Sequence, residues 1–407
     1  MKYIYYSLIC CFFALTARAQ DAVVFPYQVI ANKMVIQIKL NGKLVPMIFD
    51  TGGRNSISTA LKTEFNASVV GTMGILDANS NRKQIEVVEL EAVGFPIGED
   101  IVNAVKSEVN TIKAEPNAGK AGLENGVIVF KNPRFLVLDS EIFPCIGVQG
   151  YIGSDLLQDC TVDIDDQKKE IRITKGGRSS LMSDRQVLPF VDDAKGIPIV
   201  TLNVGKYDEI RVMFDTGSDA FLSLKNDAYE KLKTAELVQV IREGEGGGSI
   251  GVNGRGGAGK QTMVQVPELL IGAFMFTNAR AKLGNPPETL LGYQSLKYGK
   301  VTIDYVNKLF LFSPFSSDKV DLTNAKHNWN LEIYVHDGQY LVATVWGKLI
   351  GQVAVGDVLT HINGKVIKPI PFCESLTTGL PILKENTKLV FTLKTKSGVK
   401  NITVLKD

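Results

Sequence analysis

The strongest constraint on this chain is a phrase that occurs twice. The residues Ile48-Phe49-Asp50-Thr51-Gly52 return 165 residues later as Met213-Phe214-Asp215-Thr216-Gly217. In each copy an apolar strand end leads into a carboxylate, a hydroxyl and a glycine, and the glycine permits a tight turn after the aspartate. A single Asp-Thr-Gly is ordinary turn chemistry. Two copies inside a longer repeat predict two equivalent halves.

The repeat extends well beyond this phrase. Alternating apolar residues at 35–40 and 199–204 each lead through a turn into the strand that ends at the aspartate. Downstream, Tyr151-Ile152-Gly153 matches Leu290-Leu291-Gly292, where the offset has fallen from 165 to 139 residues, so the first copy carries 26 extra residues, mostly within 106–146. A long unit repeated once predicts a duplicated all-β fold rather than a solenoid of short repeats.

Asp-Thr-Gly followed downstream by two apolar residues and glycine resembles the signature of aspartic proteases of the pepsin and retropepsin type. Both halves carry it over residues 22–316, so the chain looks like a single-chain, two-lobed enzyme whose lobes are similar to bacterial retropepsin-like proteases. The resemblance implies closed, barrel-like lobes at 20–178 and 179–316. It also implies activity as a monomer on a peptide or protein substrate, with no cofactor and no metal.

The resemblance assigns the catalytic pair to Asp50 and Asp215. Two carboxylates held close together cannot both be ionised, so the pair shares a proton. The charged member acts as general base on a water, and the protonated member donates to the substrate carbonyl. The residues implied to support the aspartate loops are Thr51, Gly52, Thr216, Gly217, Ser218, Ile152, Gly153, Leu291 and Gly292.

The chain departs from the family pattern near the first aspartate. Gly53 stands where the family usually has alanine or serine, and Arg54 follows it. A cation there favours ionisation of the aspartate, unless the side chain points into solvent. The family's flap tyrosine is missing from residues 68–85, where Gly71 and Gly74 mark a first flap. Gly247 and Gly248 mark the second, in a glycine-rich stretch that is either a flap or a disordered loop.

Several other functions are disfavoured by the sequence. All three histidines, His327, His336 and His361, lie beyond the repeat, which excludes a histidine-based nucleophile or zinc site within the lobes. The net charge of +2 gives no electrostatic argument for nucleic acid. Residues 254–262 resemble a phosphate-binding loop, but an alternating strand follows where a helix is required. Asp163, Asp165 and Asp166 lack calcium-loop spacing, and we expect them on a solvated face.

The two ends of the chain carry separate signals. Residues 1–19 combine Lys2, an apolar run and a small-x-small site, which predicts a signal peptide and an exported, periplasmic or extracellular protein. The alternative is a buried N-terminal helix. No second apolar run is long enough to span a membrane. In residues 317–407, the stretch from Gly356-Asp357 to Asn363-Gly364 resembles the centre of a PDZ domain, which implies a peptide ligand. The alternative is a generic hairpin.

In an oxidising compartment, Cys145 and Cys160 are candidates for a disulfide, or for two reduced buried thiols. The sequence thus predicts an exported aspartic endopeptidase with a PDZ-like module that positions substrate or regulates access. A peptide-binding protein that has the same fold but no catalysis is the alternative.

Overall fold

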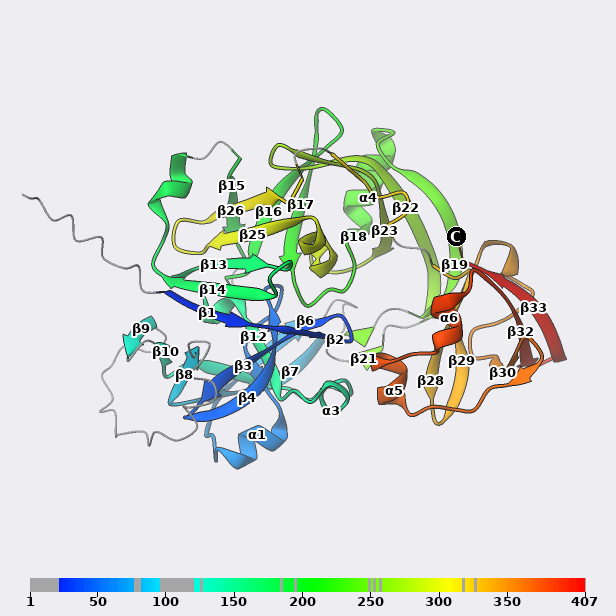
Figure 1. The fold of residues 1–407 in the computed structure, drawn as a ribbon, viewed down its shortest axis with the longest axis horizontal. Coiled ribbons are helices and arrows are strands. Elements are labelled where there is room, and N and C mark those ends of the chain that lie inside the picture. The colour runs from blue at the N-terminus through cyan, green and yellow to red at the C-terminus, as the bar shows by residue number, and fades with distance from the viewer. Residues whose placement is uncertain are drawn as a thin grey trace, which may run out of the picture.

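The computed structural model describes residues 22–76, 82–95, 121–124, 127–183, 186–193, 196–247, 250–251, 254–255, 258–316, 319–325 and 328–406. The predicted signal peptide, Gly248 and His327 lie outside the described residues. Figure 1 shows the N-terminal half in blue and cyan below a green and yellow second half, with an orange and red C-terminal module beside both.

The first lobe is built on an eleven-stranded sheet. Its hairpin arms alternate buried and exposed side chains, and the turn between them uses Asn41 and Gly42, which both have positive φ angles of 45° and 80°. The short helix begins at the cap Ser58, whose hydroxyl accepts from the Leu61 amide. The elements are β2 (Gln28–Ile30), β3 (Lys33–Leu40), β4 (Lys43–Asp50), β5 (Ser56–Ile57), α1 (Thr59–Glu64), β6 (Val69–Leu76), β7 (Arg82–Glu89), β8 (Ala92–Phe95), β9 (Ala121–Glu124), β10 (Val127–Lys131), β11 (Arg134–Val137), α3 (Phe143–Ile146) and β12 (Gly150–Gly153).

The second lobe repeats the same plan. A hairpin leads to the second aspartate, a short strand and a helix follow, and a long hairpin closes the sheet. The elements are β15 (Leu188–Asp192), β16 (Pro198–Val204), β17 (Asp208–Asp215), β18 (Leu222–Lys225), α4 (Asn226–Thr234), β19 (Gln239–Gly247), β22 (Ala258–Ile271), β23 (Phe274–Gly284), β24 (Thr289–Gly292) and β27 (Val320–Asp321). The predicted all-β, duplicated architecture is therefore confirmed.

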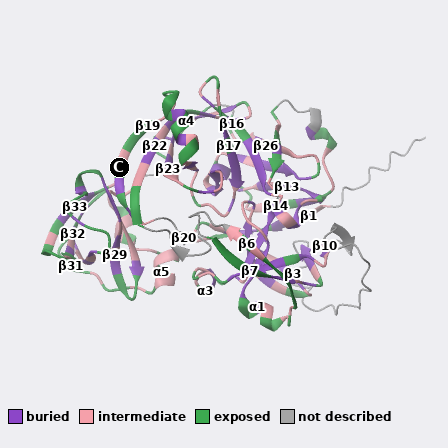
Figure 2. Cartoon of the chain, turned by 180° about the vertical axis from the view of Figure 1, so that it is seen from behind, coloured by how far each residue is buried: buried purple, intermediate pink, exposed green. Residues whose placement is uncertain are grey.

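A shared sheet joins the lobes behind the cleft. Its strands are β1 (Ala22–Pro26), β14 (Glu170–Lys175), β13 (Cys160–Asp165), β25 (Gly299–Asp304) and β26 (Leu309–Pro314), with β15 at the far edge. The central pairing crosses between lobes, with Val162 opposite Ile303. Figure 2 shows these central strands as largely buried, whereas α1 on the outside of the first lobe is mostly exposed.

The expectation of a solvated face for the three aspartates is wrong. Asp166 is buried and accepts hydrogen bonds from Tyr27 of the first lobe and, at 2.7 Å, from Tyr293 of the second. Asp163 accepts from the Arg178 guanidinium at 2.6 Å. Carboxylates at the seam between two lobes can be buried because these donors satisfy them.

The C-terminal module has a core of its own, which begins at Leu331, whereas Leu322 still packs with the lobes. The Gly-Asp and Asn-Gly phrases serve local turns. The Asp357 carboxylate accepts from the Ala354 amide at 2.8 Å, and Asn363 has a positive φ of 51°. The elements are β28 (Leu331–His336), β29 (Gln339–Trp346), β30 (Val358–Ile362), β31 (Lys365–Val366), α5 (Phe372–Thr377), α6 (Pro381–Glu385), β32 (Lys388–Thr395) and β33 (Gly398–Leu405).

The module is attached to both lobes. Toward the second lobe, β29 pairs with β19, with Gly244 opposite Trp346 and Gly246 opposite Thr344. A Cβ atom on Gly244 would lie 2.6 Å from the Trp346 ring, so this strand must be glycine-rich to approach the module. Toward the first lobe, a disulfide links Cys145 in α3 to Cys373 in α5.

That bond corrects the predicted pairing of Cys145 with Cys160. Cys160 is a free cysteine, and its side chain is fully buried in the sheet that joins the lobes. Cys145 lies instead on a short helix that packs against α5 of the module, 228 residues away from its partner in sequence. Tertiary packing, and not closeness in sequence, decides the pairing.

Candidate active site

Both aspartates lie at the ends of strands that a second strand supports. β4 ends at Asp50 and pairs in parallel with β12, so that Gly153 lies opposite Asp50. β17 ends at Asp215 and pairs in parallel with β24, so that Gly292 lies opposite Asp215. The structure thus places the apolar-apolar-Gly segments beside the aspartate loops, as the sequence predicts. Ile152 and Leu291 are fully buried behind them.

Two buried threonines hold the loops together across the lobe interface. The Thr51 hydroxyl donates to the Phe214 carbonyl at 2.8 Å and accepts from the Thr216 amide at 3.1 Å. In the mirror image, the Thr216 hydroxyl donates to the Phe49 carbonyl at 2.8 Å and accepts from the Thr51 amide at 3.0 Å. These four bonds fix each aspartate loop to the other lobe.

The glycines of the two loops make room for the opposite carboxylate. A Cβ atom on Gly52 would lie 2.4 Å from Cγ of Asp215, and one on Gly217 would lie 2.5 Å from Oδ2 of Asp50. Both distances are shorter than non-bonded atoms allow, so any side chain here would push the lobes apart. The supporting Gly153 is equally constrained, because its Cβ would lie 2.5 Å from the Gly53 carbonyl oxygen.

The two carboxyl groups lie close together at the floor of the cleft, because each lies beside the glycine of the opposite loop. The Gly52 amide donates to Oδ1 of Asp50 at 3.0 Å, and the Gly217 and Ser218 amides donate to Oδ1 of Asp215 at 2.8 and 3.1 Å. Burial, followed by the charge of Asp215, raises the pKa of Asp50 well above its ordinary value. Burial also raises the pKa of Asp215. The pair therefore holds one proton over a range in which isolated aspartates are ionised.

Sequence reasoning missed a lysine beside this pair. Lys33, the first residue of β3, donates to the Gly217 carbonyl and lines the cleft. Its charge lowers the pKa of both Asp50 and Asp215, against the larger effect of burial. The repeat offers one signal for it. The two hairpins are aligned by Val35 and Ile199, which lie opposite Ile48 and Met213, so the residue equivalent to Lys33 is Ile197, and this cation belongs to one half alone.

The cleft around the pair has a volume of about 1170 Å³ and is lined by both lobes and by the module. Arg54 lines it, so this side chain does not point away into bulk solvent. The residues that the module contributes are Glu332, Ile333, Tyr334, Ala343, Thr344 and Leu376. The C-terminal module therefore forms part of the wall of the same cavity that contains Asp50 and Asp215.

The two predicted flaps differ in the structure. Gly71 and Gly74 are exposed on β6, in a hairpin with β7, and the neighbouring Ile75 lines the cleft. Gly247 lines the cleft directly, at the end of β19. The arms of this second hairpin, β19 and β22, are paired strands, and β19 also pairs with the module.

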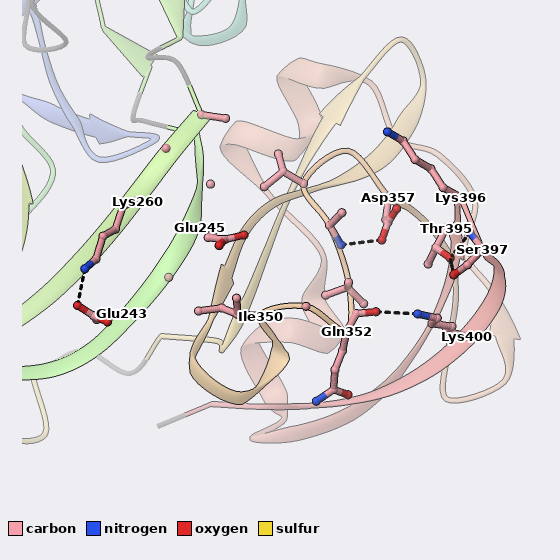
Figure 3. Close-up of a pocket in the computed structure, with 18 residues that line it drawn as sticks. Glu243, Glu245, Lys260, Ile350, Gln352, Asp357, Thr395, Lys396, Ser397 and Lys400 are labelled. Carbon is pink, nitrogen blue, oxygen red and sulfur yellow. Dashed lines mark hydrogen bonds and ion pairs between the residues drawn. The ribbon is translucent and has the colours of Figure 1, made fainter.

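A second cavity, of about 780 Å³, lies between the β19–β22 hairpin and the module (Figure 3). Two of its lysines have partners within their own part, the hairpin for Lys260 and the module for Lys400. Lys260 pairs with Glu243 at 2.7 Å, and Lys400 donates to the Gln352 carbonyl at 3.1 Å. The glycines that resemble a phosphate loop lead into the strand β22, and no helix begins there. The geometry that nucleotide binding needs is therefore missing.

A comparison with protein-family models and with curated proteins gives no match. Among solved structures, the aspartic proteinase of Irpex lacteus is similar at 10% identity, covering 72% of this chain and 98% of that chain. The basic 7S globulin of soybean is similar at 12% identity, covering 72% and 95%, and the conglutin gamma of lupine seeds at 11%, also covering 72% and 95%. Each comparison has a TM-score of 0.39.

The fold resembles that of pepsin-like aspartic proteases. Because the likeness to the solved structures is distant and includes seed globulins as well as a proteinase, it carries no argument about activity. The functional argument rests on the aspartate pair and its surroundings.

Proposed function

We propose that the chain is an exported aspartic endopeptidase. The observation that carries the proposal is the close pair of carboxyl groups of Asp50 and Asp215, with pKa values raised by burial, at the floor of a cleft large enough for an extended peptide. One proton on the pair gives a base and an acid side by side, which is what hydrolysis by an activated water requires.

In the proposed reaction, the ionised carboxylate takes a proton from a water while the protonated carboxyl donates to the substrate carbonyl oxygen. The water's hydroxyl bonds to the carbonyl carbon, which gives a tetrahedral intermediate without a covalent enzyme adduct. The intermediate collapses when the C–N bond breaks: the protonated carboxyl gives its proton to the leaving nitrogen, and the ionised carboxylate takes a proton from one hydroxyl, so a carboxylic acid and an amine leave and the pair again holds one proton. The loop amides of Gly52, Gly217 and Ser218 orient the carboxylates throughout.

The test is cleavage of a peptide library by the wild type and by Asp50→Asn and Asp215→Asn. Each substitution removes the acid–base pair but keeps an oxygen that accepts from the loop amides. We expect both variants to fold with an unchanged circular dichroism spectrum and to lose turnover by at least a thousandfold. Normal turnover in either variant would refute the proposal.

Export is supported by the Cys145–Cys373 disulfide, because such bonds persist in oxidising compartments. Mass spectrometry of the secreted protein, with and without alkylation before reduction, tests both export and the bond. A chain that keeps residues 1–19 and free thiols at both cysteines would contradict this part. Within the described helices, none has the length and apolar character of a membrane span.

We propose that the PDZ-like module positions the substrate. Its strand β28 is bonded on one side to β29, and its residues Glu332 and Ile333 line the cleft that contains the aspartate pair. An extended peptide can lie along such a strand. Ile333→Asp should raise KM for long peptides and leave KM for short peptides unchanged. Val399→Asp, on the exposed outer strand β33, should leave KM unchanged for both kinds of peptide.

A peptide-binding protein without catalysis is the second candidate. Gly53 and the position of Lys33 against the Gly217 carbonyl favour it, because both depart from symmetry around the pair. Binding of library peptides without turnover between pH 3 and pH 8 would support this candidate, and inhibition of turnover by pepstatin would refute it.

A further inference from the structure

The two aspartate loops carry opposite charges at equivalent positions. Arg54 follows Asp50 by four residues, and Asp219 follows Asp215 by four residues. The backbone confirms that the loops are equivalent, because the Ser154 amide donates to the Gly53 carbonyl at 3.2 Å and the Tyr293 amide donates to the Ser218 carbonyl at 2.8 Å. The twofold relation of the halves therefore places Arg54 and Asp219 on opposite sides of the aspartate pair.

Arg54 is held at the cleft with unused hydrogen-bonding capacity. It lines the cavity, and its Nε atom is buried without a hydrogen-bond partner among the described residues. The charge of Arg54 lowers the pKa of Asp155, against the larger effect of burial, and the Asp155 carboxylate accepts from the Asn55 amide at 2.9 Å. Because Arg54 lines the cleft and forms no ion pair with a described residue, its guanidinium can pair with a carboxylate of a bound peptide.

Asp219 presents its carboxylate to the other side of the cleft. Its backbone carbonyl accepts from the side-chain nitrogen Nε2 of Gln294 at 2.9 Å, which anchors the loop. The side chain is exposed, lines the cavity and forms no ion pair with a described residue. Two further acidic residues line the cleft, and both accept hydrogen bonds: Asp193 from the Ile197 amide at 3.1 Å and Glu332 from the Trp346 indole at 3.0 Å.

We propose that the cleft selects peptides by charge on both sides of the bond to be cut, with an acidic side chain beside Arg54 and a basic side chain beside Asp219. This inference rests on the proposed function, because it describes the substrate of the same cleft. A guanidinium binds a carboxylate through two parallel hydrogen bonds, and a carboxylate in turn attracts lysine or arginine. The enzyme's preferred sites then carry opposite charges, separated by the scissile bond.

Charge-reversal variants test the proposal with a library in which acidic and basic residues are varied at each position around the cut. The variants are Arg54→Glu, Asp219→Arg and the double exchange, assayed at pH 6, where peptide carboxylates are ionised. Arg134→Glu and Asp227→Arg are the matched controls, because both residues are largely exposed, at 70%, and lie outside the cleft.

We expect kcat/KM of the wild type to be higher by about tenfold or more for the acidic residue on one side and for the basic residue on the other. Arg54→Glu should invert the preference for the acidic residue alone, and Asp219→Arg should invert the preference for the basic residue alone. The double exchange should invert both preferences, and the two control variants should change neither preference. Thermal melting of each variant checks folding. A wild type that cuts without charge preference, or an Arg54→Glu variant that still prefers the acidic residue, would overturn the inference and leave the proposed function intact.

A binding measurement distinguishes failure of the proposed function from failure of this inference. If the wild type cuts no peptide, fluorescence anisotropy measures binding of the same peptides to the same variants. Inverted charge preference in binding supports the subsites without catalysis, and binding that ignores charge overturns them.

Discussion

The bonds between the two threonines make a strong prediction about stability. Thr51→Val removes a hydroxyl and keeps the shape of the side chain, so it leaves the Phe214 carbonyl and the Thr216 amide without partners in a buried site. A buried polar group left unsatisfied costs about 1–3 kcal/mol, so two such groups should lower the free energy of unfolding by about 2–6 kcal/mol. Thr216→Val should cost the same, because its hydroxyl makes the two mirror-image bonds.

Thr51→Ser is the control, because it keeps the hydroxyl and loses only one methyl group, at about 1 kcal/mol. Urea unfolding should be followed by far-ultraviolet circular dichroism, since both tryptophans, Trp329 and Trp346, belong to the module and their fluorescence reports that part. We also expect kcat/KM to fall further in the valine variant, because the loops lose their alignment. Equal stability of the valine and serine variants would refute the reasoning.

Three further predictions follow from single groups. Burial raises the pKa of Asp155 to about 6, so its contribution to stability is complete below its unfolded value near 3.8 and is lost as the pH rises through 6. Asp155→Asn should therefore be more stable than the wild type at pH 7, by roughly 3 kcal/mol, and equal to it at pH 3, as measured by urea titration at both pH values. Equal stability at pH 7 would contradict this. Lys33→Met should move both limbs of the pH–rate profile to higher pH, because the lysine lowers the pKa of both Asp50 and Asp215. Lys43→Met, in an exposed ion pair, is the control. An unmoved profile in Lys33→Met would exclude the effect. Cys373→Ser should lower stability by about 2–5 kcal/mol in calorimetry, whereas an unchanged melting profile would show that the bond between lobe and module is dispensable.

The features that the sequence predicts correctly depend on short stretches of chain. The duplicated lobes and the aspartate loops can be predicted because they depend on residues that are close together in the sequence. These residues form the alternating strands, the Asn41-Gly42 turn and the Asp-Thr-Gly phrase. The repeat then pairs Asp50 with Asp215, because equivalent residues of two facing halves meet at the axis between them.

The features that escape prediction depend on contacts between distant segments. Cys145 has no signal that directs it to Cys373, since the bond exists only because α3 and α5 pack together. The glycine-rich stretch that includes Gly247 is typical of a flap or of a disordered loop, and nothing in it indicates that Gly244 and Gly246 leave room for the module, which pairs with that strand. Asp166 is buried rather than solvated, because two tyrosines from different lobes meet it.

Each loop glycine lies against the carboxylate of the other half, and this limits which positions can differ between the two halves of the repeat. Gly52 leaves space for the aspartate of the second half, and Gly217 leaves space for the aspartate of the first. A side chain at Gly52 would displace the carboxyl group of Asp215, which lies 163 residues away in the sequence. A side chain at Gly217 would displace the carboxyl group of Asp50. Elsewhere the two halves differ, as Lys33 and its equivalent Ile197 do. The two halves share the Asp-Thr-Gly phrase where each half leaves space for the aspartate of the other.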